Sequence, residues 1–116
     1  MGIEVDMANK YFRKHVIPSA ATETELYQVP TANQAIVKSL RITNANASRA
    51  TITVSEFDDG TGTEYFLLKS YTLAPNATVD IFNGVPLVLQ EADMLKVESS
   101  VATVHFYLSY LEMDRN

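Results

Sequence analysis

The two histidines are the residues best suited to chemistry in this chain, and neither has the neighbours that chemistry needs. A zinc site takes three or four Cys, His or carboxylate ligands, and the chain has no cysteine. His15 and His105 are far apart, and each falls on the polar side of a strand-like segment. We therefore expect two surface histidines and no metal site.

The serines and glycines do not form a catalytic or phosphate-binding motif either. No G-x-S-x-G sequence is present, and Ser109 alternates outward within a strand-like run. Gly60-Thr61-Gly62 lacks the Lys-Ser/Thr pair that a phosphate loop requires. The fourteen acidic residues lie mostly in turns or at strand ends, where water solvates them. The sequence predicts no enzyme and no cofactor.

One acidic loop could bind a cation. Asp58, Asp59 and Glu64 flank Gly60 and Gly62, and calcium prefers such oxygen-rich loops. The spacing does not match the twelve-residue EF-hand pattern. Asp-Gly between two strand-like runs is a strong hairpin signal. We interpret the loop as a tight hairpin, with calcium as the alternative.

A short basic segment near the start of the chain is the best candidate for binding a partner. The chain as a whole carries a net charge of −5, which disfavours a nucleic-acid binder. The segment fits three interpretations: a plain strand, a docking element for an acidic protein surface, or a site that stacks single-stranded nucleic acid. We predict docking, with no nucleic acid, through Lys10, Tyr11, Phe12, Arg13 and Lys14.

The composition is that of one small folded domain. The 116 residues are 47% hydrophobic, which is enough for a core. The absence of cysteine fits a reducing cell interior or a particle assembled there. No apolar run is long enough to span a membrane. No basic stretch followed by an apolar one marks a secretory signal.

The segments that must position any site read as β-strands. In 103–111, Val104, Phe106, Leu108 and Tyr110 point one way and polar residues the other, which is typical of a strand with one buried face. Short apolar runs separated by turns recur along the chain. We predict an all-β, antiparallel β-sandwich of roughly eight strands, jelly-roll-like. Immunoglobulin-like and simple Greek-key arrangements stay open.

Two details of this pattern lead to specific expectations. In 35–43, Ile36, Leu40 and Ile42 are expected to share a face, with Lys38 breaking the pattern. The runs 65–68 and 87–89 are apolar on both faces, which suggests surface buried between copies of the chain. The predicted oligomer interface is Tyr65, Phe66, Leu68, Leu87 and Leu89.

We divide the chain into an N-terminal arm with the first strand (1–15) and a sandwich domain (16–116).

Several motifs, in order, resemble a group of small β-sandwich structural proteins of tailed bacteriophages. They lie within residues 27–112, a region of about three quarters of the chain, and are VPTANQAIVKSLRITNAN, ATITV, LAPNATVDI, LVLQEADMLKVESS and VHFYLSYLE. That group often has glycine before the aspartate of the fourth motif, whereas this chain has Ala92-Asp93. If that position requires a positive φ, alanine fits it poorly, so we expect this turn to differ.

The resemblance implies a virion component, assembled in the host cytoplasm. Our first hypothesis is a capsid decoration (cement) protein, a homo-oligomer, expected to be a trimer, that clamps subunits of the major capsid protein. The second is a neck, tail or baseplate component. A third, from a different class, is a carbohydrate- or receptor-binding module that uses Tyr71, Tyr107 and Tyr110 as a platform.

Overall fold

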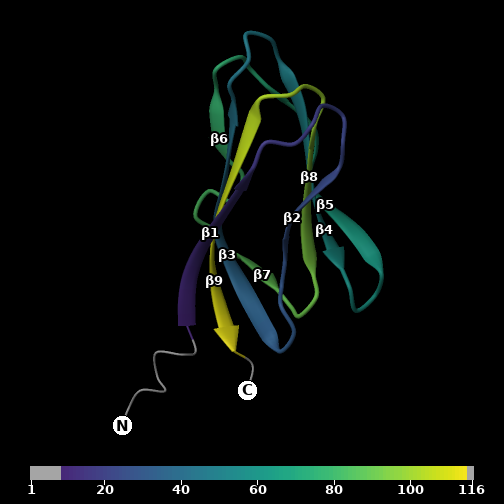
Figure 1. The fold of residues 1–116 in the computed structure, drawn as a ribbon, viewed down its shortest axis with the longest axis vertical. Coiled ribbons are helices and arrows are strands. Elements are labelled where there is room, and N and C mark those ends of the chain that lie inside the picture. Colours follow the sequence, from purple (N-terminus) through teal and green to yellow (C-terminus); the bar gives the residue numbers. More distant parts are fainter. Residues whose placement is uncertain (1–8, 115–116) are drawn as a thin grey trace.

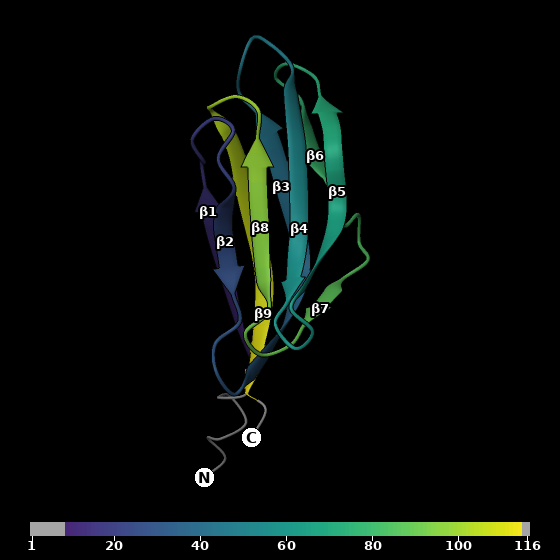
Figure 2. The ribbon, with the colours of Figure 1, turned by 90° about the vertical axis from the view of Figure 1, so that its right-hand side faces the viewer.

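The protein folds into two β-sheets packed face to face (Figures 1 and 2). A computed structural model describes residues 9–114. The strands are β1 (Asn9–Val16), β2 (Thr24–Gln28), β3 (Asn33–Asn44), β4 (Ala50–Asp58), β5 (Thr63–Leu73), β6 (Thr78–Asp80), β7 (Leu87–Leu89), β8 (Met94–Ser99) and β9 (Val104–Asp114). Residues 9–114 contain no helix of the length and apolar character that crossing a bilayer would take.

The strand order is that of a jelly roll. One sheet has the order β1-β9-β3, with β6 and β7 both pairing with β3, and the other has the order β2-β8-β4-β5. Every pairing is antiparallel. β6 and β7 pair with different parts of β3, so together they count as one strand of the sheet. The nine strands therefore fill the eight strand positions of two Greek keys. The predicted all-β jelly-roll-like sandwich is confirmed.

The central strand β9 carries the core as its alternation predicts. Val104, Phe106 and Leu108 are fully buried, and Tyr110 is nearly so. They lie against the buried aliphatic side chains of β3, β4 and β8. Period-two alternation survives here because β9 pairs with β1 in continuous register over eight residues.

The expected faces of β3 are wrong at Ile36 and Val37, and a β-bulge is the reason. The register with β9 shifts between Val37 and Ser39, so Lys38 is an extra residue. The shift reverses which alternate side chains of β3 face the core. Val37 is therefore buried before the bulge and Leu40 after it, whereas Ile36 is only half-buried.

The turn before β8 keeps an unusual backbone conformation although its residue is alanine. Ala92 has φ 70°, a conformation that costs an L-residue with a Cβ about 1–2 kcal/mol. The turn is held by its neighbours, because the Ala92 amide donates to the Val29 carbonyl and the Val29 amide donates to the Asp93 carbonyl, both at 3.0 Å. Hydrogen bonding therefore maintains the positive φ that alanine tolerates poorly.

The expected boundary between arm and sandwich, at residue 15, falls inside β1. This strand runs to Val16 and pairs with β9 along its whole length. Residues 1–8 of the expected arm lie outside the described residues. Deleting residues 1–15 would remove a strand from the sheet, so substitutions separate docking from folding more cleanly.

Candidate interaction surfaces

The predicted docking residues form the exposed edge strand β1. Its cations Lys10, Arg13 and Lys14 are all exposed, and Tyr11 is 75% exposed. We call Lys10–Val16 the basic strand. Its positive charge is therefore available to a partner.

The two faces of the basic strand differ. Phe12 lies opposite Tyr110 on the side toward the other sheet, and their rings stack with centroids 5.6 Å apart. On the outer side, Arg13 Nη1 donates to the Tyr107 hydroxyl at 3.4 Å, and His15 stacks on the same ring at 5.7 Å. Phe12 thus anchors the strand, while its outer side remains basic and aromatic.

A shallow groove of about 370 Å³ runs over this outer side. It crosses three strands of the same sheet, β1, β9 and β3. Its walls combine aromatic rings with two cations and several hydroxyl groups, which suits an anionic chain better than a fully apolar one. The lining residues are Tyr11, Phe12, Arg13, Lys38, Tyr107, Ser109 and Tyr110.

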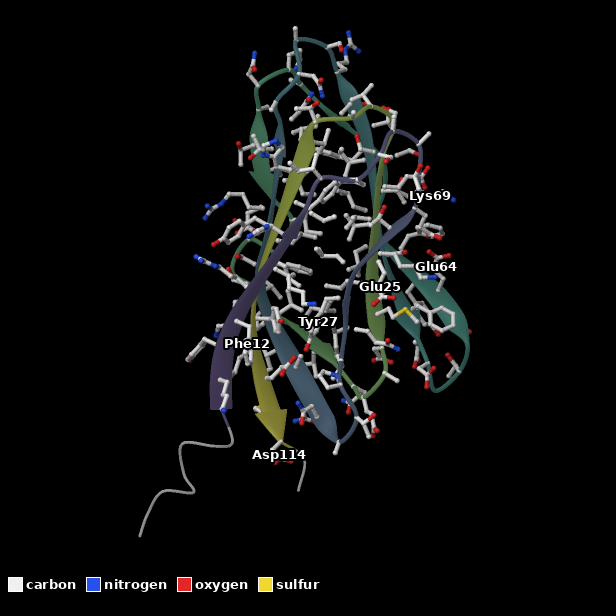
Figure 3. All side chains as sticks on the ribbon, viewed as in Figure 1. Phe12, Glu25, Tyr27, Glu64, Lys69 and Asp114 are labelled. Carbon is white, nitrogen blue, oxygen red and sulfur yellow. The ribbon has the colours of Figure 1, made fainter. Side chains whose placement is uncertain are left out.

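The residues predicted as the oligomer interface differ in their exposure. Tyr65 and Phe66 are consecutive residues of the edge strand β5 and are 51% and 48% exposed, on opposite sides of the strand; we call this pair of residues the aromatic patch. Lys69 covers the Phe66 ring at 4.2 Å. Figure 3 shows Lys69 and Glu64 on the side of the molecule away from Phe12. The aromatic patch and the basic strand therefore occupy opposite edges.

The other three predicted interface residues have side chains that are less exposed to solvent than those of Tyr65 and Phe66. Leu68 and Leu87 are only partly buried and pack against the core. Leu89 is fully buried in β7 against β3, so its prediction as an interface residue is wrong. The β7 segment supplies one side chain to the core of its own chain, which the double-sided apolar pattern could not reveal.

A second, apolar groove of about 300 Å³ opens beside β5. Six residues separate β6 from β7, and they leave the sheet there. The groove lies at this point, where the strand that pairs with β3 is interrupted. Val85 at its rim is 70% exposed. The lining residues are Leu67, Ile81, Phe82, Val85, Pro86 and Leu87.

The acidic loop is a hairpin built by its own hydrogen bonds. The Gly62 amide donates to the Asp58 carbonyl at 2.7 Å, and the Gly60 amide donates to Asp58 Oδ1 at 3.0 Å. Glu64 points elsewhere and accepts from the Ser55 hydroxyl at 2.5 Å. Among residues 9–114, no group of three His, Asp or Glu side chains is placed to hold a metal ion.

Asp93 ties this hairpin to the neighbouring turn. It is 4% exposed and accepts from the amides of Asp59 at 3.1 Å and Gln90 at 2.9 Å. Burial, together with the nearby Asp93 and Asp58 carboxylates, raises the pKa of Glu56. Two carboxyl groups that share one site cannot both ionise without mutual repulsion. The charged form of Glu56 is therefore less favourable in the folded chain than in water.

An inter-sheet hydrogen bond at the β1 side was not foreseen from the sequence. The Tyr27 hydroxyl on β2 donates to Glu112 Oε2 on β9 at 2.6 Å, and the Tyr27 and Tyr110 rings lie 4.2 Å apart. Burial and the Glu112 carboxylate raise the pKa of Tyr27 above its usual range and that of Tyr110 to about 12. Glu112 closes the last motif of the family resemblance, and here it joins the two sheets.

The three tyrosines suggested as a carbohydrate platform do not come together. Tyr110 is 4% exposed, so it belongs to the core. Tyr71 lies on β5 of one sheet and Tyr107 on β9 of the other. A sugar-binding platform needs neighbouring exposed rings, and these side chains do not provide one.

Comparison with protein-family models and with curated protein sequences finds no match. Solved structures do match. A subunit of Bacillus endospore appendages, described as disulfide-linked pili, has a TM-score of 0.56 at 11% identity and covers 94% of this chain and 90% of its own. A chain of the cyanophage Pam1 capsid asymmetric unit has a TM-score of 0.50 at 16% identity, covering 90% and 86%.

A third match comes from particles derived from infectious bursal disease virus. It has a TM-score of 0.56 at 6% identity and covers 92% of this chain. This chain spans only 32% of that viral protein. At such identities the likeness shows a shared fold, a β-sandwich that occurs in virus capsids and in a pilus.

Proposed function

We propose that this chain is a non-enzymatic structural protein of a bacteriophage particle, and specifically a capsid decoration (cement) protein. It forms a homo-oligomer, expected to be a trimer, and clamps neighbouring subunits of the major capsid protein. The match to a chain of a cyanophage capsid is the observation that supports this most strongly, because it covers 90% of this chain and 86% of that one. Assembly takes place in the host cytoplasm.

The placement of the two exposed surfaces supports a clamping role. The basic strand and the aromatic patch occupy opposite edges of the sandwich (Figure 3). A protein that bridges neighbours needs at least two separate contact surfaces. The basic strand suits an acidic capsid surface, and Tyr65 and Phe66 suit contact with another copy, because exposed aromatic residues are enriched at interfaces.

A neck, tail or baseplate component is the second candidate, since the same fold and surfaces would serve there. A reconstruction of the intact particle separates the two: copies spread over the capsid lattice indicate decoration, and a few copies at one vertex indicate the tail. A disulfide-linked pilus is disfavoured because the chain has no cysteine. A glycan array without binding would leave the carbohydrate-binding alternative without support.

Charge reversal on the basic strand tests the capsid contact. Lys14→Glu should weaken co-sedimentation with particles that lack the protein by about 10-fold or more, because it places like charges at the interface. Arg49→Glu is the matched control: it makes the same change of charge at an exposed loop position away from β1. Equal binding by both variants and the unmodified chain would contradict the proposed contact.

A further inference from the structure

Four apolar side chains form a row across the outer face of one sheet, the left-hand layer in Figure 1. Tyr11 on β1 lies opposite Leu111 on β9, which lies opposite Ile36 on β3. Ile36 in turn lies opposite Val88 on β7. Each points away from the core, because the next residue of its strand points toward it. We call these four residues the apolar row.

The apolar row is open to solvent at both ends. Tyr11 is 75% exposed and Val88 is 54% exposed, whereas Leu111 and Ile36 between them are half-buried. Apolar residues scattered singly over a surface need no explanation, but adjacent ones that form a continuous patch mark a contact surface.

Two cations lie beside the apolar row on the same face. Arg13 follows Tyr11 by two residues on β1, and Lys38 follows Ile36 by two residues on β3. Tyr11, Arg13 and Lys38 all line the shallow groove on this face. The groove therefore joins the apolar row to both cations.

The charges on this face favour an acidic partner. Arg13, Lys38 and Arg41 point outward from it, and Asp80 on β6 lies opposite Arg41. Within residues 9–114, the other carboxylates of this sheet fall on the opposite side by alternation. Three cations and one carboxylate leave an excess of positive charge, although the chain as a whole is negative.

We infer that the outer face of β1, β9, β3 and β7 docks on an acidic protein surface of the phage particle. The partner places apolar side chains on the apolar row and a carboxylate in the groove that Arg13 and Lys38 line. This inference rests on the proposed capsid contact and gives its site and chemistry. It extends that contact from the edge of β1 to a surface that crosses the whole sheet.

The side chains of this face fit a protein better than a nucleic acid. Single-stranded nucleic acids are held on aromatic rings that stack with successive bases, and three of the four residues of the apolar row are aliphatic. Protein interfaces combine an apolar centre with a polar rim, as this face does. The same face of a second copy would bring the same excess of cations, so charge favours an acidic protein.

One pair of valine variants tests the apolar row. Val88→Asp should weaken binding to capsids of the parent phage assembled without this chain by about 10-fold or more, because it places a carboxylate in an apolar contact. Val85→Asp is the matched control, since it makes the same change at a still more exposed valine outside this face. It should bind like the unmodified chain, and equal weakening by both variants would overturn the inference.

Charge reversal tests the groove. Lys38→Glu should also weaken capsid binding by about 10-fold or more, because it sets like charges together, whereas Lys38→Arg and Arg49→Glu should bind like the unmodified chain. If Lys14→Glu weakens binding but Lys38→Glu and Val88→Asp do not, the contact is confined to the edge of β1. That result would overturn the inference and leave the proposed function standing.

Hydroxyl-radical footprinting of the unmodified chain covers variants that fold poorly. Capsid binding should protect Tyr11 and Leu111 from oxidation, and absence of protection in a bound chain would overturn the inference. Protection already present in the purified chain and lost on dilution would assign the face to a second copy instead. Binding of a labelled single-stranded oligonucleotide that competes with capsids would assign it to nucleic acid. An unmodified chain that binds no capsid refutes the proposed function, and the inference with it.

Discussion

The basic strand and β5 contain the same dipeptide, Tyr-Phe, on opposite edges of the sandwich, and they use it differently. In β1, Phe12 stacks on Tyr110 and so fastens a regular strand to the core. In β5, Phe66 lies under Lys69 on the surface of a strand with two register shifts. An edge strand can thus offer either its backbone or its side chains to a partner, and its neighbours decide which.

Truncating one tyrosine near each edge gives the largest expected contrast. Tyr110→Ala should lower the free energy of unfolding by about 3–5 kcal/mol, because it empties a buried site between Phe12 and Tyr27. Tyr65→Ala should change it by less than about 0.5 kcal/mol, because that ring is half exposed. Urea denaturation measures both, and similar losses would abolish the distinction between the edges.

The hydrogen bond between Tyr27 and Glu112 should give the next largest effect. Tyr27→Phe should lower the free energy of unfolding by about 1.5–3 kcal/mol, because a carboxylate then loses a buried donor. Tyr107→Phe is the matched control, since its hydroxyl accepts only a long, exposed bond from Arg13. Thermal unfolding in parallel compares them, and an equal decrease would show that the carboxylate finds another partner.

The turn near the β5 hairpin should be open to improvement. Ala92→Gly should raise the free energy of unfolding by about 1 kcal/mol, because glycine adopts the φ of 70° without strain. Ala77→Gly, in a turn where the residue does not have a positive φ, should be neutral or destabilising. A destabilising Ala92→Gly would indicate that the greater entropy of the unfolded glycine chain outweighs the strain.

Glu56 should give the smallest effect, and one that depends on pH. Its folded pKa lies above the unfolded value, so its stabilising contribution is full below the unfolded pKa and is lost as pH rises through the folded pKa. Glu56→Gln should therefore stabilise the fold at neutral pH, by less than about 1 kcal/mol because solvent screens the half-buried group. Thermal unfolding of both proteins against pH should show the difference vanish in acid.

The strands were predictable from the sequence because side-chain alternation is a local property. The alternation in 103–111 predicted the buried face of β9, and Asp-Gly predicted the hairpin between β4 and β5. The faces of 35–43 were not predictable, because the bulge at Lys38 arises from pairing with β9. The role of Glu112 was equally hidden, since its partner Tyr27 lies on the other sheet.

For the candidate surfaces, the residue types alone predicted Lys10–Lys14 and Tyr65–Phe66 as contact residues, because charge and aromatic content can be read from the sequence. Only the tertiary structure assigned Leu89 to the core, placed the two surfaces on opposite edges, and left β1 as the regular free edge. The physical reason is that burial and edge position depend on which distant strands pair, and a single shift in register reverses which side chains face the core.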